Sequence, residues 1–129
     1  MARIDPKQRQ LILQAMISMA SADGQIDAGE TVVIRSAYTD ETGEDISADD
    51  VARAAASYRA GSGALSSALS NACADMDRTT REALLRASYL VLLADGRVAA
   101  RERKKLQDIA AALKISEIHL SVILEDVSG

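Results

Sequence analysis

A nine-residue segment that occurs twice constrains the fold of this chain more than any other feature. Residues 22–30 read Ala-Asp-Gly-Gln-Ile-Asp-Ala-Gly-Glu, and residues 94–102 read Ala-Asp-Gly-Arg-Val-Ala-Ala-Arg-Glu. Ala, Asp, Gly and Glu occupy the same four places in both copies, and Ile26 corresponds to Val98. Each copy follows one apolar segment with helical spacing and precedes another. We therefore expect two helical hairpins, each with an Asp-Gly elbow.

The rest of the chain also has the spacing of helices. We expect a helix from Pro6, capped by Asp5, to about residue 22, and others at about 28–43, 48–60 and 64–74. A fifth helix, capped by Asp77 or Thr79, runs to the second Asp-Gly. Two more follow, one with Leu106, Ile109, Ala110 and Leu113 and a last one after Ser116 with Ile118, Val122, Ile123 and Val127.

These patterns predict an all-α fold. The fifth helix is apolar nearly all round in its second half, so it should lie at the centre of a bundle. The chain has 24 Ala and one Pro, and no segment alternates apolar and polar residues for long enough to form a strand. The sequence therefore predicts one domain over residues 1–129, a bundle of about seven helices with two pseudo-repeated hairpins.

Composition excludes several classes of function. The net charge is −4, the pI is near 4.9, and the chain has no Phe or Trp and only three Tyr, which argues against binding of nucleic acid. A single cysteine, Cys73, excludes an internal disulfide and fits a reducing compartment. The sequence has neither an apolar run long enough to span a membrane nor a signal-peptide pattern, so we expect a cytoplasmic protein.

The two elbows carry carboxylates where helix geometry disfavours them. Asp23 and Asp95 each precede the glycine that should end a helix, and a negative charge there faces the negative end of the helix dipole. The neighbouring helix N–H groups, a basic side chain or a bound cation could compensate. The second half of each elbow has the spacing of an EF-hand loop, although the first half lacks the carboxylates of a true EF-hand. If the elbows meet, a hard cation such as Ca²⁺ or Mg²⁺ could bind the five carboxylates of Asp23, Asp27, Glu30, Asp95 and Glu102.

A purely structural interpretation of the elbows stays open. Asp27 and Glu30 have the spacing of a capping box, which would explain both residues without a ligand. Ala99 occupies the corresponding cap position of the second copy and has no side-chain acceptor.

Charge is unevenly distributed along the chain. Six acidic residues and no basic residue lie in the segment 40–50, whereas Arg101, Arg103, Lys104 and Lys105 form a basic cluster. These groups are interpreted either as solvated helix faces or as surfaces that dock a partner or a second copy of the chain.

The sequence contains none of the following catalytic motifs. His119 is the sole histidine, and no motif joins it to Cys73. The chain has no Gly-x-Ser-x-Gly nucleophile elbow, and Gly61-Ser62-Gly63 is not followed by the Lys of a P-loop. Met16, Met19 and Met76 are interpreted as core residues. We therefore expect a protein that is not an enzyme.

The paired elbows, Tyr38 eight residues after Glu30, and the later Leu-x-x-Ile-Ala-x-x-Leu of residues 106–113 together resemble the TerB-like family of tellurite resistance proteins. The resemblance extends from about Leu11 to Leu124. It implies an all-helical domain of bacterial stress-response systems that binds metal through the acidic elbow residues, here Asp23, Asp27, Glu30, Asp95 and Glu102. The resemblance also implies partners in a stress-response complex. The alternative is an interaction module whose acidic elbows are only helix caps.

Overall fold

The chain is folded almost entirely into helices. The computed structural model describes residues 4–20, 26–58, 64–94 and 100–128, and within these ranges it contains no β-strand. The helices are α1 (Pro6–Ala20), α2 (Ala28–Thr42), α3 (Ala48–Ser57), α4 (Ala64–Ala72), a 3-10 turn η1 (Cys73–Asp75), α5 (Arg78–Ala94), α6 (Ala100–Ala112) and α7 (Glu117–Ser128). The prediction of an all-α fold with about seven helices is confirmed.

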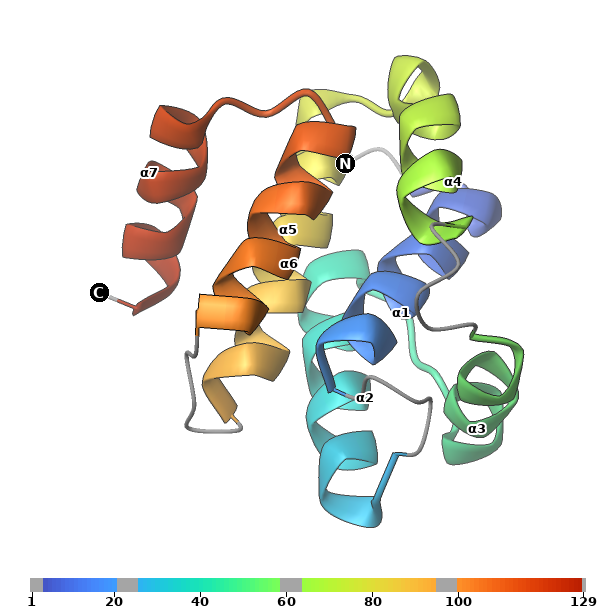
Figure 1. The fold of residues 1–129 in the computed structure, drawn as a ribbon. Coiled ribbons are helices and arrows are strands. Elements are labelled where there is room, and N and C mark those ends of the chain that lie inside the picture. Colours follow the sequence, from blue (N-terminus) through green and yellow to red (C-terminus); the bar gives the residue numbers. More distant parts are fainter. Residues whose placement is uncertain (1–3, 21–25, 59–63, 95–99, 129) are drawn as a thin grey trace.

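Helix α5 is the central element of the bundle. It packs against α1, α2, α6 and α7, and α7 lies at one edge of the molecule with α3 and α4 at the other (Figure 1). Leu84, Leu85 and Leu92 of α5 are fully buried. The second half of α5 is apolar nearly all round because it contacts neighbours on several sides. The predicted central position of this helix is therefore confirmed.

The two hairpins of the repeat supply most of the remaining core. Helix α1 contributes Ile12, Met16 and Ile17, α6 contributes Leu106, and Leu113 follows directly after α6, all with almost no exposed surface. Met19 and Met76 are buried as well, so the interpretation of the three methionines as core residues is confirmed.

Most helix starts follow the caps expected from the sequence. The backbone N–H of Lys7 donates to Asp5 Oδ1 at 2.8 Å, and the N–H of His119 donates to Ser116 Oγ at 3.1 Å. At α5 the cap is Asp77 rather than Thr79, because Asp77 Oδ1 accepts the N–H of Thr80 at 2.8 Å. That hydrogen bond lowers the pKa of the Asp77 carboxyl, since it stabilises the ionised form.

Two helix ends differ from the prediction. Helix α3 ends at Ser57, because Tyr58 has extended backbone (φ −71°, ψ 133°). Helix α4 ends at Ala72 and tightens into η1. The carbonyl of Cys73 accepts a hydrogen bond from Arg81 at 2.8 Å, and that of Asp75 accepts one from Gln8 at 3.0 Å. Side chains from α5 and α1 thus satisfy the backbone groups that a longer helix would otherwise pair.

Helix α7 is rotated so that part of its apolar surface faces outward. Leu120 and Ile123 are buried, whereas Ile118 is 81% exposed and Val122 is 51% exposed. On the side of α7 that faces the bundle, His119 Nε2 also lies 2.9 Å from Glu82 Oε1 on α5.

Candidate functional site

A pocket of about 290 Å³ lies where the first hairpin meets α5. Its wall includes Ala20, the last residue of α1, and Ala94, the last residue of α5. Asp27 and Glu30, at the start of α2, complete its polar side. The helices that lead into the two Asp-Gly elbows therefore end at one pocket, together with two of the five predicted carboxylates.

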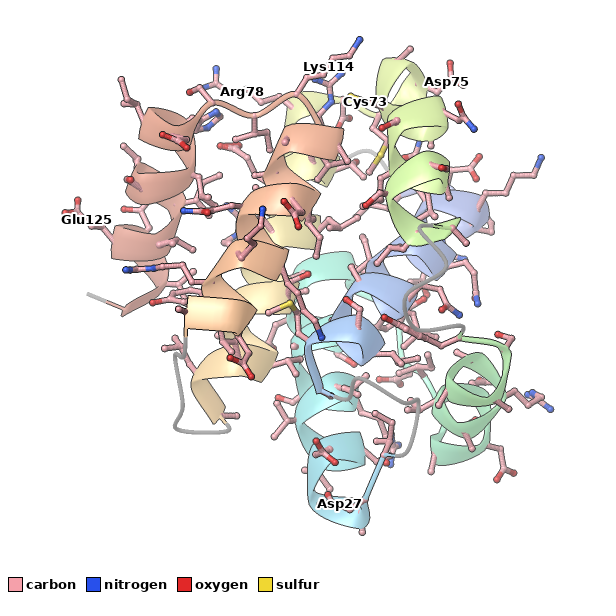
Figure 2. All side chains as sticks on the ribbon, in the orientation of Figure 1. Asp27, Cys73, Asp75, Arg78, Lys114 and Glu125 are labelled. Atoms are coloured by element: carbon pink, nitrogen blue, oxygen red, sulfur yellow. The ribbon has the colours of Figure 1, made fainter. Side chains whose placement is uncertain are left out.

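Asp27 and Glu30 form a capping box at the start of α2. Asp27 Oδ1 accepts the backbone N–H of Glu30 at 2.7 Å, and Glu30 Oε1 accepts the backbone N–H of Asp27 at 3.1 Å. Asp27 lies at the end of the molecule where α2 begins (Figure 2). The structural function that the sequence offered for these two residues is thus confirmed. Each carboxylate has a second oxygen that the capping box does not use.

Glu102 occupies the equivalent position in the second hairpin. It is the third residue of α6, as Glu30 is the third residue of α2. Its Oε2 atom is buried and lacks a hydrogen-bond partner, and within the described ranges no other buried side-chain nitrogen or oxygen does so. A buried acceptor without a donor is unfavourable, and more so when it carries charge. This oxygen is therefore available to a proton donor or a cation.

The other two predicted ligands, Asp23 and Asp95, lie outside the described residues. Among the residues that are described, no three His, Cys, Asp or Glu side chains are grouped so that they could hold a metal ion. The structure thus brings Asp27 and Glu30 together and does not add Glu102 to them as a third ligand. A cation site built from the five carboxylates stays a prediction.

A basic side chain lies at the C-terminal end of α1. Lys105 Nζ of α6 donates to the carbonyl oxygen of Ser18 at 3.0 Å. A cation at this end of a helix interacts favourably with its dipole. A basic side chain is one of the three groups expected to compensate the negative charge of the first elbow. The sequence indicates Lys105 only as a member of a basic cluster, because this contact joins residues 87 positions apart.

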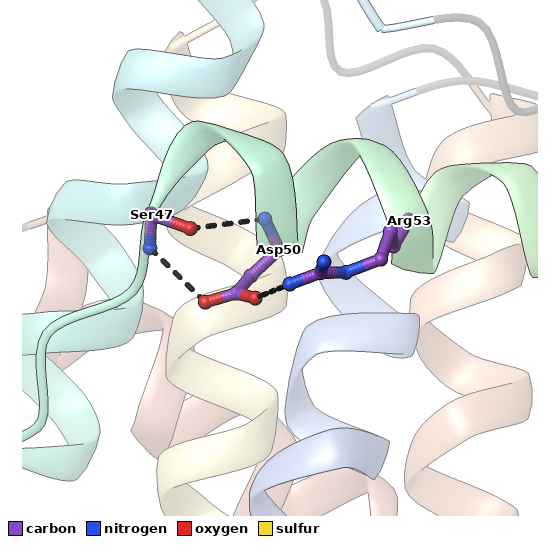
Figure 3. Close-up of polar contacts among 3 residues, drawn as sticks. All are labelled: Ser47, Asp50 and Arg53. Atoms are coloured by element: carbon purple, nitrogen blue, oxygen red, sulfur yellow. Dashed lines mark hydrogen bonds and ion pairs between the residues drawn. The ribbon is translucent and has the colours of Figure 1, made fainter.

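The acidic segment 40–50 is partly used within the fold. Glu41 Oε1 accepts a hydrogen bond from Arg86 Nε of α5 at 2.9 Å, and both side chains are partly buried. Asp50 forms a capping box with Ser47 and pairs with Arg53 on the next turn of α3 (Figure 3). The hydrogen bonds from Arg53 and Ser47 hold the pKa of Asp50 below its usual value. Glu41 and Asp50 therefore have structural partners within the fold.

Cys73 and His119 have separate surroundings. The buried Cys73 thiol lies 3.2 Å from the carbonyl oxygen of Leu113, whereas His119 pairs with Glu82. The sequence offered no signal for the His119–Glu82 pair, because neither residue belongs to a motif.

Comparison with known proteins decides the family. The family model described as "Tellurite resistance protein TerB" matches residues 1–40 and 41–123. The chain belongs to the TerB family. No curated protein and no solved structure gives a significant match to it.

Membership confirms the resemblance drawn from the paired elbows and supports a tellurite-resistance-related domain. TerB domains are generally not enzymes. In the part of this TerB domain that the structure describes, no helix has the length and apolarity needed to cross a membrane.

Proposed function

We propose that this TerB domain is a non-enzymatic stress-response module that binds a divalent cation, Ca²⁺ or Mg²⁺, at the end of the bundle where α1 and α5 end. The observation that carries the proposal is the buried, unpartnered Oε2 of Glu102. An ionised carboxylate oxygen in this position loses its hydration without gaining a donor, and a cation would supply the missing interaction.

Two further features support a cation. The pocket beside α2 includes Asp27 and Glu30, and each of these carboxylates retains an oxygen outside the capping box. Oxygen donors of this kind suit hard cations rather than Zn²⁺. In the proposed site Glu102 binds the cation from the second hairpin. Asp27 and Glu30 of the first hairpin are not grouped with Glu102 in the structure and would move toward it on binding, with Asp23 and Asp95 as the remaining ligands.

The test is calorimetric titration of metal-stripped protein with Ca²⁺, then Mg²⁺ and Zn²⁺. We expect saturable binding by the wild type, loss of binding in Glu102→Gln, and loss in the double variant Asp23→Asn/Asp95→Asn. Glu117→Gln is the matched control, since Glu117 is an exposed acidic residue in the first turn of α7. Wild-type protein that is folded and binds none of the three ions would refute the proposal, and so would equal affinity in the Glu102→Gln variant.

The second candidate is a protein–protein interaction module whose elbows are structural caps. The capping box of Asp27 and Glu30 favours it, because that geometry accounts for both residues without a ligand. In this case the exposed side chains of the acidic segment 40–50 or of Arg103 and Lys104 would dock a partner of a stress-response complex or a second copy of the chain. Salt-dependent association with that partner and no cation binding would favour this candidate.

A further inference from the structure

Helix α7 carries an apolar pair on its outer surface. Three large apolar side chains are exposed in the described ranges, namely Val32, Ile118 and Val122. Ile118 and Val122 are four residues apart on α7, so they lie one above the other on the same face. A single exposed apolar residue is ordinary, whereas neighbouring ones on one helix form a surface that a partner can cover.

Acidic residues lie near this pair along α7. Glu117, Glu125 and Asp126 are exposed on α7, and residues 117–128 contain no Lys or Arg. Figure 2 shows Glu125 at the outer edge of the molecule, pointing away from the bundle. His119, the remaining titratable side chain of α7, faces α5 and pairs with Glu82. The outer face of α7 therefore combines an apolar centre with a negative border.

We propose that the outer face of α7 binds a basic amphipathic helix of another polypeptide. Apolar side chains one turn apart on the partner would pack on Ile118 and Val122, because two helices in side-by-side contact match residues at this spacing. Lys or Arg side chains flanking the partner's apolar residues would then meet Glu117, Glu125 and Asp126.

The same charges disfavour other occupants. A second copy that used its own α7 would bring two acidic borders together, which is unfavourable. Helix α6 of a second copy exposes Arg103 and Lys104 but, within the described residues, no large apolar side chain to pack on the pair. Anionic lipid would be repelled by the acidic border.

The proposal is tested with a synthetic helical peptide that carries Leu one turn apart and Lys beside them, labelled for fluorescence anisotropy. A second peptide has Glu in place of Lys. We expect the full chain to bind the Lys peptide, and to bind the Glu peptide about tenfold or more weakly. Affinity for the Lys peptide should fall between about 0.1 M and about 1 M salt, as charge screening increases.

The double variant Ile118→Ser/Val122→Ser removes the apolar pair and leaves the acidic residues in place. It therefore distinguishes a peptide helix that packs on the apolar pair from one that is attracted by charge alone. We expect it to bind the Lys peptide about tenfold or more weakly than the wild type, while Val32→Ser, with a similarly exposed apolar residue on α2, binds as the wild type does. Both substitutions are at exposed positions, and circular dichroism should show unchanged helix content.

Three results would overturn the proposal. The first is equal binding of the Lys peptide by the wild type and the double variant, since the acidic border alone would then be responsible. The second is a wild type that binds neither peptide. The third, in sedimentation velocity, is self-association that disappears in the double variant, which would make a second copy the occupant.

Discussion

The Glu102→Gln variant should be more stable than the wild type without a cation and less stable than the wild type when a cation is bound. In the metal-free state Oε2 of Glu102 is buried and lacks a partner. An unsatisfied buried acceptor costs roughly 1–3 kcal/mol. Gln has the same length and planar end but no charge, and its amide still needs partners, so it relieves part of this cost. We expect the free energy of unfolding in chelator to rise by about 1 kcal/mol, or roughly 4 °C in Tm for a chain of this size.

A bound cation should change which of the two proteins, the wild type or Glu102→Gln, is the more stable. Ligand that binds only the folded state at a hundred times its Kd stabilises it by about 2.7 kcal/mol. The wild type should gain this increment in excess Ca²⁺, and Glu102→Gln should gain little of it. The wild type is then the more stable protein in Ca²⁺ and the less stable one in chelator.

The assay is urea unfolding followed by circular dichroism, for both proteins and for the control Glu117→Gln, in chelator and in excess Ca²⁺. The control should respond to Ca²⁺ as the wild type does, because Glu117 is exposed on α7. A Glu102→Gln variant that is less stable than the wild type in chelator, with no effect of Ca²⁺ on either protein, would show that the carboxylate is satisfied without a cation.

Four further outcomes follow from the fold. Leu84→Ala should lower the free energy of unfolding by about 3–5 kcal/mol in urea, because this leucine is fully buried on the central helix. Leu120→Ala should lower it by about 2–4 kcal/mol, whereas Ile118→Ser two residues earlier should change it by less than about 0.5 kcal/mol, since only Leu120 is buried. Lys114→Gly should raise it by about 0.5–1 kcal/mol, because Lys114 has a left-handed backbone (φ 59°) after α6; a variant no more stable than the wild type would contradict this reasoning. The folded-state pKa of Asp77 is lowered, so its charge stabilises the fold above the unfolded-state pKa and stops doing so as pH falls through the folded-state value. The Tm difference between the wild type and Asp77→Asn should therefore shrink as the pH falls, and disappear once the pH is below the folded-state pKa of Asp77.

The helices could be predicted because their signals are local. Asp5, Ser47 and Ser116 precede apolar residues at helical spacing, and the structure caps α1, α3 and α7 with them. The choice of Asp77 over Thr79 needed the structure, because both residues have the chemistry of a cap. The end of α4 was also beyond prediction, since it depends on Arg81 of the next helix and on Gln8, which is 67 positions from its acceptor Asp75.

The candidate site could be predicted only in part. The pairing of Asp27 with Glu30 follows from their spacing, and the structure contains it. Whether Glu102 has a partner depends on which helices cover it, so no pattern in the sequence indicates its unpaired oxygen. The outward position of Ile118 has a similar cause, because it depends on which side of α7 packs on the bundle, here the side with Leu120 and Ile123.

The central position of α5 has a consequence for synthesis on the ribosome. Helices α1 and α2 come first in the chain, yet both pack on α5, which ends at Ala94. The apolar side chains that they direct toward α5 have no cover until that helix has emerged. We expect the nascent chain to contain helices early and to close its core late, so a fragment that ends after α4 should remain expanded and prone to association.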